Sequence, residues 1–210
     1  MKLGVIGSGN IGKSIGSWAA KLGYDVTFSA KDEAHAKAAA QAAGQNAKAA
    51  SVRAAVEAAD LVLLAVPYGA VKAVMSDIAS LVRGKTVIDA TNALAPDFSS
   101  LTLGFTTSAA EEIAKFAPEA HLVKAFNTVF AQVYTSQNPT IQGKAISVFI
   151  AGDHQEAKDK VTALVRKMGF DAVDCGPLRN ARNIEPLAML NISLGYGQKL
   201  GTGIGFTLLR

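Results

Sequence analysis

The residues of this chain that could do chemistry begin with a run of glycines near its start. The stretch Gly7-Ser8-Gly9-Asn10-Ile11-Gly12 has the pattern G-x-G-x-x-G, and Gly16 follows one helical turn later. An apolar strand is predicted over 3–6 and a helix over 10–22. In that setting the first glycine permits a tight turn, the second lets a pyrophosphate approach the backbone, and the third lets helix and strand pack closely. The stretch predicts a dinucleotide-binding site, with close packing alone as the alternative.

The end of the second predicted strand, over 25–29, indicates which dinucleotide is bound. A site for NAD usually has Asp or Glu here, where the carboxylate hydrogen-bonds the ribose 2′-hydroxyl. This chain has Ser29-Ala30-Lys31 instead, so it offers a hydroxyl and a cation. Both groups suit a 2′-phosphate, and we therefore favour NADP over NAD. The plainer interpretation of Lys31 is a solvated surface charge.

A third candidate stretch is Ala65-Val66-Pro67-Tyr68, at the end of an apolar strand predicted over 60–66. Pro67 fixes the backbone as the chain leaves the sheet. An ordinary turn is the alternative interpretation. Because the end of a parallel strand faces the ligand crevice, we expect this stretch to form the wall that receives the nicotinamide half of the cofactor.

These residues need a scaffold, and the predicted elements alternate between strand and helix. Strands are expected over 3–6, 25–29, 60–66, 86–90, 121–126, 145–151 and 171–175. Helices are expected over 10–22, 32–43, 51–59, 70–82, 153–169 and 181–199, with a further one capped by Ser108 and the 153–169 helix capped by Asp153. Long irregular stretches over 91–107 and 127–144 follow strand ends, where ligands bind.

This order of elements predicts the fold class and the division of the chain. We expect an α/β fold: a Rossmann-type doubly wound, mostly parallel sheet with a short C-terminal helical, glycine-rich extension. Residues 1–178 would form an NADP-binding Rossmann domain. Residues 179–210 would form a C-terminal helix and a glycine-rich tail that serves packing, dimerisation or the substrate side.

Composition argues against several classes of function. Half of the 210 residues are hydrophobic, and the net charge is only +4 with no basic run, so nucleic-acid binding has little support. One cysteine, no signal peptide and no apolar stretch long enough to span a bilayer predict a cytoplasmic protein without membrane insertion. No metal-ligand spacing and no Ser–His–Asp set is evident, so no metal is expected and no catalytic residue is assigned. Surface or capping roles are expected for His35, His121 and His154.

Nearly the whole chain resembles the NADP-dependent oxidoreductases of the deazaflavin coenzyme F-420, and it is similar to the reductase domains of the metal-reducing membrane proteins called STEAP. The three stretches described above carry part of the resemblance. More specific segments are GFTTSAAE over 104–111, KAFNT over 124–128 and CGPLRNAR over 175–182, together with the glycine-rich end over 195–208.

The resemblance implies hydride transfer between NADP(H) and the C5 atom of a flavin-like ring, with coenzyme F-420 as the favoured ring acceptor. The residues that the family would use are Ser8, Asn10 and Ile11 at the phosphates, Ser29 and Lys31 at the 2′-phosphate, Val66 and Pro67 at the nicotinamide, and Asn127, Thr128 and Ala131 at the second ring. The family commonly has arginine where this chain has Ala30, so a weaker preference for NADP is expected.

Several alternatives stay open at this point. The protein could be an NADPH-dependent reductase of a small imine or carbonyl, as in pyrroline-5-carboxylate reductase, or of FMN or FAD. It could also be a non-catalytic NADP-binding redox sensor, because a glycine loop without an evident acid or base suits a sensor as well. The glycines of the tail permit close backbone approach to a ligand or a twin subunit. The short segment after the last predicted strand leads us to expect a homodimer that completes the site.

Overall fold

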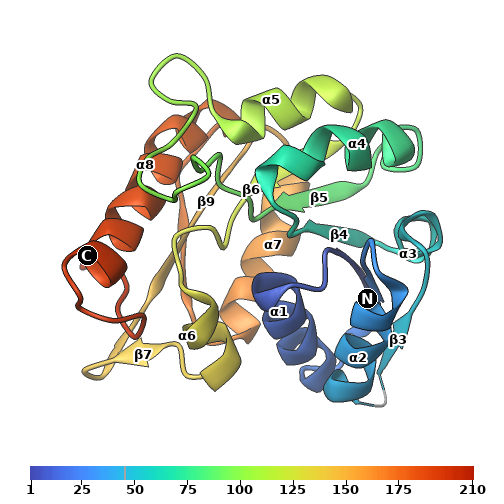
Figure 1. Cartoon of the computed structure of the whole chain (residues 1–210), viewed down its shortest axis with the longest axis horizontal. Helices are drawn as coiled ribbons and strands as arrows, with labels where there is room; N and C mark the ends of the chain where they lie inside the picture. Colours follow the sequence, from blue (N-terminus) through green and yellow to red (C-terminus); the bar gives the residue numbers. More distant parts are fainter. Residues whose placement is uncertain (45) are drawn as a thin grey trace.

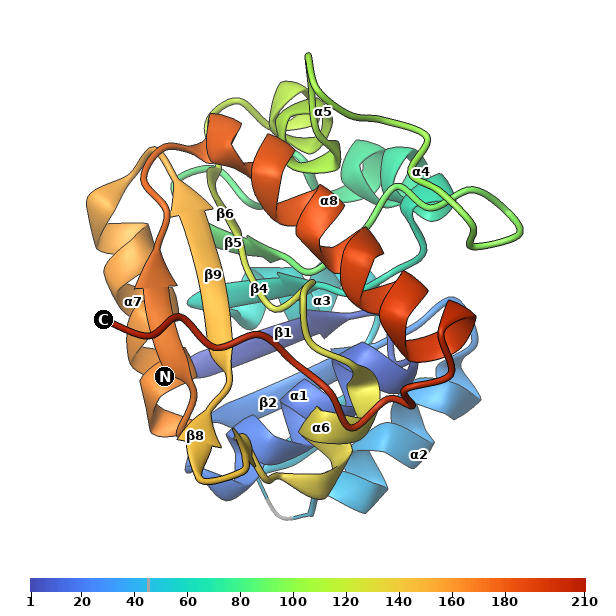
Figure 2. The same cartoon turned by 90° about the vertical axis from the view of Figure 1, so that its left-hand side faces the viewer.

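A central sheet organises this computed structural model, as Figure 1 and Figure 2 show. The sheet has eight strands, and the structure describes residues 1–44 and 46–210. The strand order is β10-β9-β6-β5-β4-β1-β2-β3. The strands of the sheet are β1 (Lys2–Ile6), β2 (Asp25–Ser29), β3 (Ala47–Ala49), β4 (Leu61–Leu64), β5 (Thr86–Asp89), β6 (His121–Lys124), β9 (Ser147–Gly152) and β10 (Asp171–Asp174). A separate hairpin pairs β7 (Thr140–Ile141) with β8 (Lys144–Ala145).

Helices cover both faces of the sheet (Figure 1). They are α1 (Asn10–Lys21), α2 (Glu33–Ala43), α3 (Val52–Ala58), α4 (Tyr68–Ile78), α5 (Ala109–Phe116), α6 (Ala131–Ser136), α7 (Gln155–Lys167) and α8 (Ala181–Ile192). A 3₁₀ turn over Leu178–Asn180 precedes α8, and a π-helical turn over Ser193–Gly197 follows it. Among the described residues, no helix is long and apolar enough to cross a membrane.

The sheet is parallel except at one junction. β1 lies between β2 and β4 and runs parallel to both, so the chain order reverses beside β1. The exception is the short antiparallel contact in which Val123 and Lys124 of β6 pair with Gly152 and Ala151 of β9. Parallel strands with crossover helices on both faces define a doubly wound Rossmann-type fold, and the expected fold class is confirmed. The fold places the ligand crevice at the carboxyl ends of β1 and β4.

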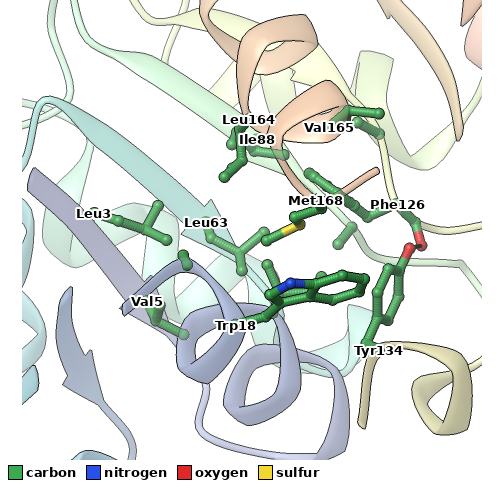
Figure 3. Close-up of a cluster of buried hydrophobic side chains, with 14 of the residues drawn as sticks. Leu3, Val5, Trp18, Leu63, Ile88, Phe126, Tyr134, Leu164, Val165 and Met168 are labelled. Atoms are coloured by element: carbon green, nitrogen blue, oxygen red, sulfur yellow. Dashed lines mark hydrogen bonds between the residues drawn. The ribbon is translucent and has the colours of Figure 1, made fainter. Parts of the chain in front are cut away.

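Two apolar cores fill the space between the sheet and its helix layers. The first packs the sheet against α1, α2, α6 and α7 and includes Trp18, Tyr134 and Met168 (Figure 3). The second packs the opposite face against α3, α4 and α5. Burial of each large apolar side chain stabilises the fold by about 1.5–3 kcal/mol. Gly16 allows α1 to sit this close, because a Cβ there would lie 2.5 Å from Phe28 Cε1.

The structure corrects several predicted elements. The irregular stretch expected over 127–144 contains α6 and the β7–β8 hairpin, and β3 was not predicted. The helix expected over 181–199 ends as an α-helix at Ile192. Asp153 does not cap α7: His154 occupies the N-cap position, while Asp153 Oδ1 accepts a hydrogen bond from Leu178 N at 2.9 Å. Elements as short as β3 and α6 present too few residues to show a period.

The C-terminal tail runs back from α8 across the start of β9 (Figure 2). Ser147 N donates to Phe206 O at 2.8 Å, and Thr207 Oγ1 donates to Ala145 O at 3.0 Å. Close approach within this chain explains two of the tail glycines. A Cβ on Gly195 would lie 2.7 Å from Phe130 Cζ, and one on Gly205 would lie 2.9 Å from Ile146 Cγ2.

Candidate active site

The glycine loop follows β1 and is fixed by contacts with its neighbours. Gly7 has a φ of +101°, which side chains rarely adopt, and a Cβ there would lie 2.5 Å from Ala65 O. A Cβ on Gly12 would lie 1.9 Å from Gly7 O. Gly7 N and Ser8 Oγ both donate to Ser29 O, at 2.9 and 3.0 Å. The loop is therefore held in a tight turn by the ends of β2 and β4.

Gly9 differs from its neighbours because nothing in the described chain crowds it. It is exposed, it is the N-cap of α1, and an added Cβ would have no heavy atom within 4 Å. The first N–H groups of a helix lack intrahelical partners and carry a partial positive charge. α1, which is described throughout, has no acidic residue in its first turn to offset this charge. Open space in front of such a helix start suits a pyrophosphate.

The two residues predicted at the 2′-phosphate lie in different environments. Ser29 is completely buried, and its Oγ donates to Val5 O at 3.0 Å. This hydroxyl therefore faces the protein interior, and its contact with a 2′-phosphate stays a prediction. Lys31 is exposed beyond the strand end. Asp32 caps α2 by accepting a hydrogen bond from Ala34 N at 2.9 Å, so its carboxylate serves the helix start.

The end of β4 lies against the glycine loop, because a Cβ on Gly7 would lie 2.5 Å from Ala65 O and 2.8 Å from Val66 Cγ1. The nicotinamide wall expected at Ala65, Val66, Pro67 and Tyr68 stays a prediction. Ala65 N donates to Ile6 O at 2.9 Å, which extends the β1–β4 pairing beyond the regular strands. Pro67 is the N-cap of α4, and Tyr68 is the first residue of that helix. Tyr68 is half-buried, and burial raises the pKa of its phenol, with smaller contributions from Glu112, Glu185 and Asp89. The tyrosine therefore stays protonated at neutral pH.

A groove of about 570 Å³ continues from the start of α1. Four segments that lie far apart in the sequence supply its walls: the start of α1, the loop after β5, the segment that leads into α6, and α8 with its π turn. Its lining residues are Asn10, Ile11, Asn92, Leu94, Asp97, Phe98, Asn127, Thr128, Val129, Phe130, Ala131, Gln132, Ala188, Asn191, Ile192 and Tyr196. The structure thus brings the predicted Asn10 and Ile11 together with the predicted Asn127, Thr128 and Ala131.

Paired amides hold the polar side of this groove. Asn127 Nδ2 donates to Asn92 Oδ1 at 3.0 Å, and Asn92 Nδ2 donates to Asn127 O at 3.2 Å. Asn191 Nδ2 donates to Thr128 O at 3.0 Å. Across residues 1–44 and 46–210, Asn127 Oδ1 and Thr128 Oγ1 are buried without a hydrogen-bond partner. Buried polar atoms are nearly always paired, so these two atoms mark spare hydrogen-bonding capacity at the groove.

The segment that connects β6 to α6 begins with an unusual backbone conformation. Phe126 is fully buried and has a φ of +68°, which is rare for a residue with a bulky side chain. Its carbonyl oxygen accepts a hydrogen bond from the buried Tyr134 hydroxyl at 2.8 Å (Figure 3). Burial raises the pKa of Tyr134 well above its usual value, so the hydroxyl remains a donor. Tyr134 on α6 thereby fixes the turn that presents Asn127 and Thr128 to the groove.

A buried ion cluster lies at the carboxyl ends of β5 and β6. Lys124 Nζ is 2.9 Å from Asp89 Oδ2 and 3.0 Å from Glu185 Oε1, and it donates to Thr91 O at 2.6 Å. Sequence analysis missed this cluster, and also the groove residues Asn92, Asn191 and Tyr196. The available signal was a polar residue at the end of an apolar strand, as at Asp89 and Lys124. Among the described residues, no group of three or more His, Cys, Asp or Glu side chains could hold a metal.

His121 and His154 lie at the amino end of β6, and neither of them lines the groove. His121 begins β6, and its ring stacks on that of His154 with centroids 3.7 Å apart and planes 5° apart. Burial and the charge of His154 lower the pKa of His121. His154 occupies the N-cap position of α7 without a capping bond from its side chain. The two histidines therefore contact each other and the start of α7, and neither contacts the glycine loop in the described contacts.

The fold, the glycine loop and the adjoining groove define a Rossmann-type dinucleotide-binding protein of the oxidoreductase class. The family model described as "NADP oxidoreductase coenzyme F420-dependent" matches residues 2–93. The F420-dependent NADP reductase of Methanothermobacter marburgensis is 30% identical over 225 residues, which cover 100% of this chain and 99% of that protein. The chain belongs to the family of coenzyme F420-dependent NADP oxidoreductases, which confirms the resemblance seen in its motifs.

A solved structure and a more distant relative agree with this assignment. The putative F420-dependent NADP reductase from Arthrobacter sp. FB24 superposes with a TM-score of 0.89 at 27% identity and covers 100% of both chains. The metalloreductase STEAP3 of Rattus norvegicus is 29% identical over 191 residues, which cover 90% of this chain but 37% of that protein. The similarity to this relative is therefore confined to part of the longer protein.

Proposed function

We propose that this protein is an oxidoreductase that transfers a hydride between NADP(H) and the ring of coenzyme F420. The observation that carries the proposal is the continuity of the site: Asn10 and Ile11 belong both to the glycine loop and to the wall of the 570 Å³ groove. A dinucleotide on the loop would therefore have space for a second ring beside it. The names of the full-length relatives support the same pair of cofactors.

The cofactors supply the chemistry, because a hydride with its electron pair passes directly from one ring to the other. What the chain must do is bind both rings, orient them and exclude water. Gly9 and the first turn of α1 would hold the pyrophosphate, and Lys31 would contact the 2′-phosphate. Ile11, Leu94 and Phe130 make much of the groove apolar. Such a lining suits a planar ring better than a small polar carbonyl or imine.

The site residues inferred for NADP are Gly7, Ser8, Gly9, Asn10, Ile11, Gly12, Lys31, Ala65, Val66, Pro67 and Tyr68. Those inferred for the acceptor are Asn127, Thr128 and Ala131, with the α8 residues Ala188 and Asn191 added from the groove lining. The segment 179–210 would thus serve the substrate side together with residues 127–131, while 1–178 would form the NADP-binding domain.

The rate of NADPH oxidation by the purified protein tests this function. Coenzyme F420, FMN and FAD are offered in turn as acceptors, and NADH replaces NADPH as the control donor. Turnover with coenzyme F420, at a higher rate with NADPH than with NADH, is expected. Turnover with FMN or FAD alone would reassign the acceptor. Tight NADPH binding without turnover on any ring would favour a small-carbonyl reductase or a redox sensor instead.

We further propose that the protein works in the cytoplasm as a homodimer. Exposed apolar side chains gather on α8 and the segment after it, with Leu190 at 49%, Tyr196 at 61% and Leu200 at 59% exposure. A second copy of the chain would cover such a surface. Light scattering on the purified protein is expected to give twice the mass of the chain. A monomer with full activity would contradict the proposal.

A further inference from the structure

The buried ion cluster of Lys124, Asp89 and Glu185 does not line the groove, because the three side chains are enclosed by the protein. The side chains of Lys124 and Asp89 have no exposed surface, and that of Glu185 is 2% exposed. Burial disfavours the charged form of Lys124, but Asp89 and Glu185 together outweigh it and raise the pKa of the ammonium group. Lys124 is therefore charged at neutral pH. Besides these carboxylates, its Nζ contacts the backbone carbonyl of Thr91.

Stability alone is a weak reason for such a cluster. Apolar side chains of similar volume often stabilise a fold as well as a buried ion pair does. The cluster does, however, join elements that are remote in the sequence. Glu185 on α8 also accepts hydrogen bonds from Ala109 N at 2.8 Å and Ala110 N at 3.1 Å, at the start of α5. One carboxylate thus ties α8 both to the sheet and to α5.

Two sets of contacts connect the cluster to the groove. On the sheet side, Lys124 holds the carbonyl of Thr91, and the next residue is Asn92, which pairs with Asn127. On the helix side, Glu185, Ala188 and Asn191 are spaced by three residues and share one face of α8. Asn191 at the far end of that face donates to Thr128 O at 3.0 Å. Both routes end at the segment that begins with Asn127.

We propose that the Lys124–Asp89–Glu185 cluster positions α8 and the segment 127–131 as the acceptor wall of the groove, and so sets the affinity for the ring acceptor and not for NADP(H). The inference rests on the proposed function for its substrate. Its members are positioning residues, because they act through Asn92, Asn127 and Asn191. The two routes from the cluster to the groove both end on the acceptor side, whereas the glycine loop is held by Ser29 and packed against Ala65.

The variant Glu185→Gln tests the cluster with little change in shape. Its amide would direct N–H donors toward Lys124 or toward the N–H groups of α5, where only acceptors fit. We expect the KM for coenzyme F420 to rise about tenfold or more, while the Kd for NADPH stays within about twofold. Lys124→Met is the second variant and should act in the same direction. If Lys124→Met does not fold, Glu185→Gln decides the test.

Arg182→Gln is the matched control. Arg182 Nη2 lies 2.7 Å from Glu111 Oε1, so this partly exposed pair also joins α8 to α5, three residues away from Glu185. It does not contact Lys124 in the described contacts. We expect Arg182→Gln to leave the KM for coenzyme F420 unchanged. An equal rise of KM in Arg182→Gln and Glu185→Gln, or a parallel rise of KM and the Kd for NADPH, would overturn the proposal.

Hydrogen exchange followed by mass spectrometry separates this proposal from the proposed function. Peptides that cover 127–136 should exchange faster in Glu185→Gln than in the native chain, and at the native rate in Arg182→Gln. This readout needs no acceptor, so it remains decisive even if coenzyme F420 supports no turnover. Unchanged exchange over 127–136 in Glu185→Gln would show that the cluster does not hold the acceptor wall.

Discussion

Gly9 and Gly12 lie three residues apart but have different reasons to be glycine. A Cβ on Gly12 would collide with Gly7 O, whereas a Cβ on Gly9 would meet no heavy atom of the described chain within 4 Å. Gly12 is therefore required by the fold itself. No contact of the described chain requires glycine at position 9, and the proposed function assigns the open space there to the pyrophosphate. Close packing therefore accounts for Gly12 but does not account for Gly9.

Two substitutions turn this difference into a prediction. Gly9→Ser keeps a residue suited to a helix N-cap, so the free energy of unfolding should change by less than about 0.5 kcal/mol. Its side chain occupies the pyrophosphate space, and NADPH binding should weaken at least about tenfold. Gly12→Ala should instead lower the free energy of unfolding by about 1–3 kcal/mol, because the backbone has to move. Denaturant unfolding and fluorescence titration with NADPH measure the two effects. Native NADPH affinity in Gly9→Ser would refute the phosphate assignment.

Lys31 gives a second test at the residue scale, now that Ser29 is known to be buried. Lys31→Glu should weaken NADPH binding about tenfold or more, because a charge-assisted hydrogen bond contributes about 1.5–3 kcal/mol. NADH lacks the 2′-phosphate and should bind with nearly native affinity. Titration of each nucleotide against both proteins gives the ratio of losses. Equal losses would mean that Lys31 does not contact the phosphate.

At the scale of elements, α6 carries more of the site than its six residues suggest. Tyr134 anchors the left-handed Phe126, and Ser14 Oγ lies 2.7 Å from Thr135 Oγ1, which joins α6 to α1. Two consecutive residues of this helix thus contact the turn after β6 and the helix that follows the glycine loop. Its position explains how a segment expected to be irregular can form a groove wall of fixed shape.

The variant Tyr134→Phe tests how much the tyrosine hydroxyl stabilises the turn at Phe126. The variant keeps the packing of the ring in the core but leaves Phe126 O without its donor. We expect the free energy of unfolding to fall by about 1–3 kcal/mol, the usual effect of an unsatisfied buried group. Urea unfolding of the two proteins checks this value. A loss below about 0.5 kcal/mol would mean that the turn holds without the tyrosine.

Sequence alone predicted the parts of the site that depend on local chemistry. The glycine loop, α1 and the strand ends at Ala65 follow from patterns a few residues long. The burial of Ser29 was not predicted, because its hydroxyl is bonded to Val5 O on the neighbouring strand, 24 positions away in the sequence. Lys124 meets Asp89 across 35 positions of the chain, and no local pattern reports such a contact. The fold was predictable from alternation, while the acceptor wall depends on long-range packing.

At the scale of the whole molecule, the stacked histidines predict how stability depends on pH. The pKa of His121 is lowered in the folded state by burial and by His154, so the unfolded chain binds the proton more tightly. Stability should therefore fall as pH drops below about 6.5, the pKa of an unperturbed histidine. The paired carboxylates of Glu111, Asp171 and Asp174, whose pKa values are lowered, lose their contribution only at more acidic pH.

Thermal unfolding between pH 7.5 and 5.5 checks this dependence. His121→Asn removes the titrating group and should flatten the curve in that range, whereas His35→Asn on the exposed start of α2 should leave it unchanged. A native slope in His121→Asn would assign the pH dependence to other groups.

Among the described residues, Asn10 and Ile11 are the only groove-lining residues that come before position 92. In the proposed site, separate stretches of the chain therefore bind the hydride donor and the hydride acceptor. Mutations of groove residues after position 91 should change the acceptor specificity and leave the glycine loop intact. A directed-evolution library confined to 92–98, 127–132 and 188–196 should thus yield proteins that accept new rings and still use NADPH. The same separation would let related chains diverge in their acceptor while the first half of each stays alike.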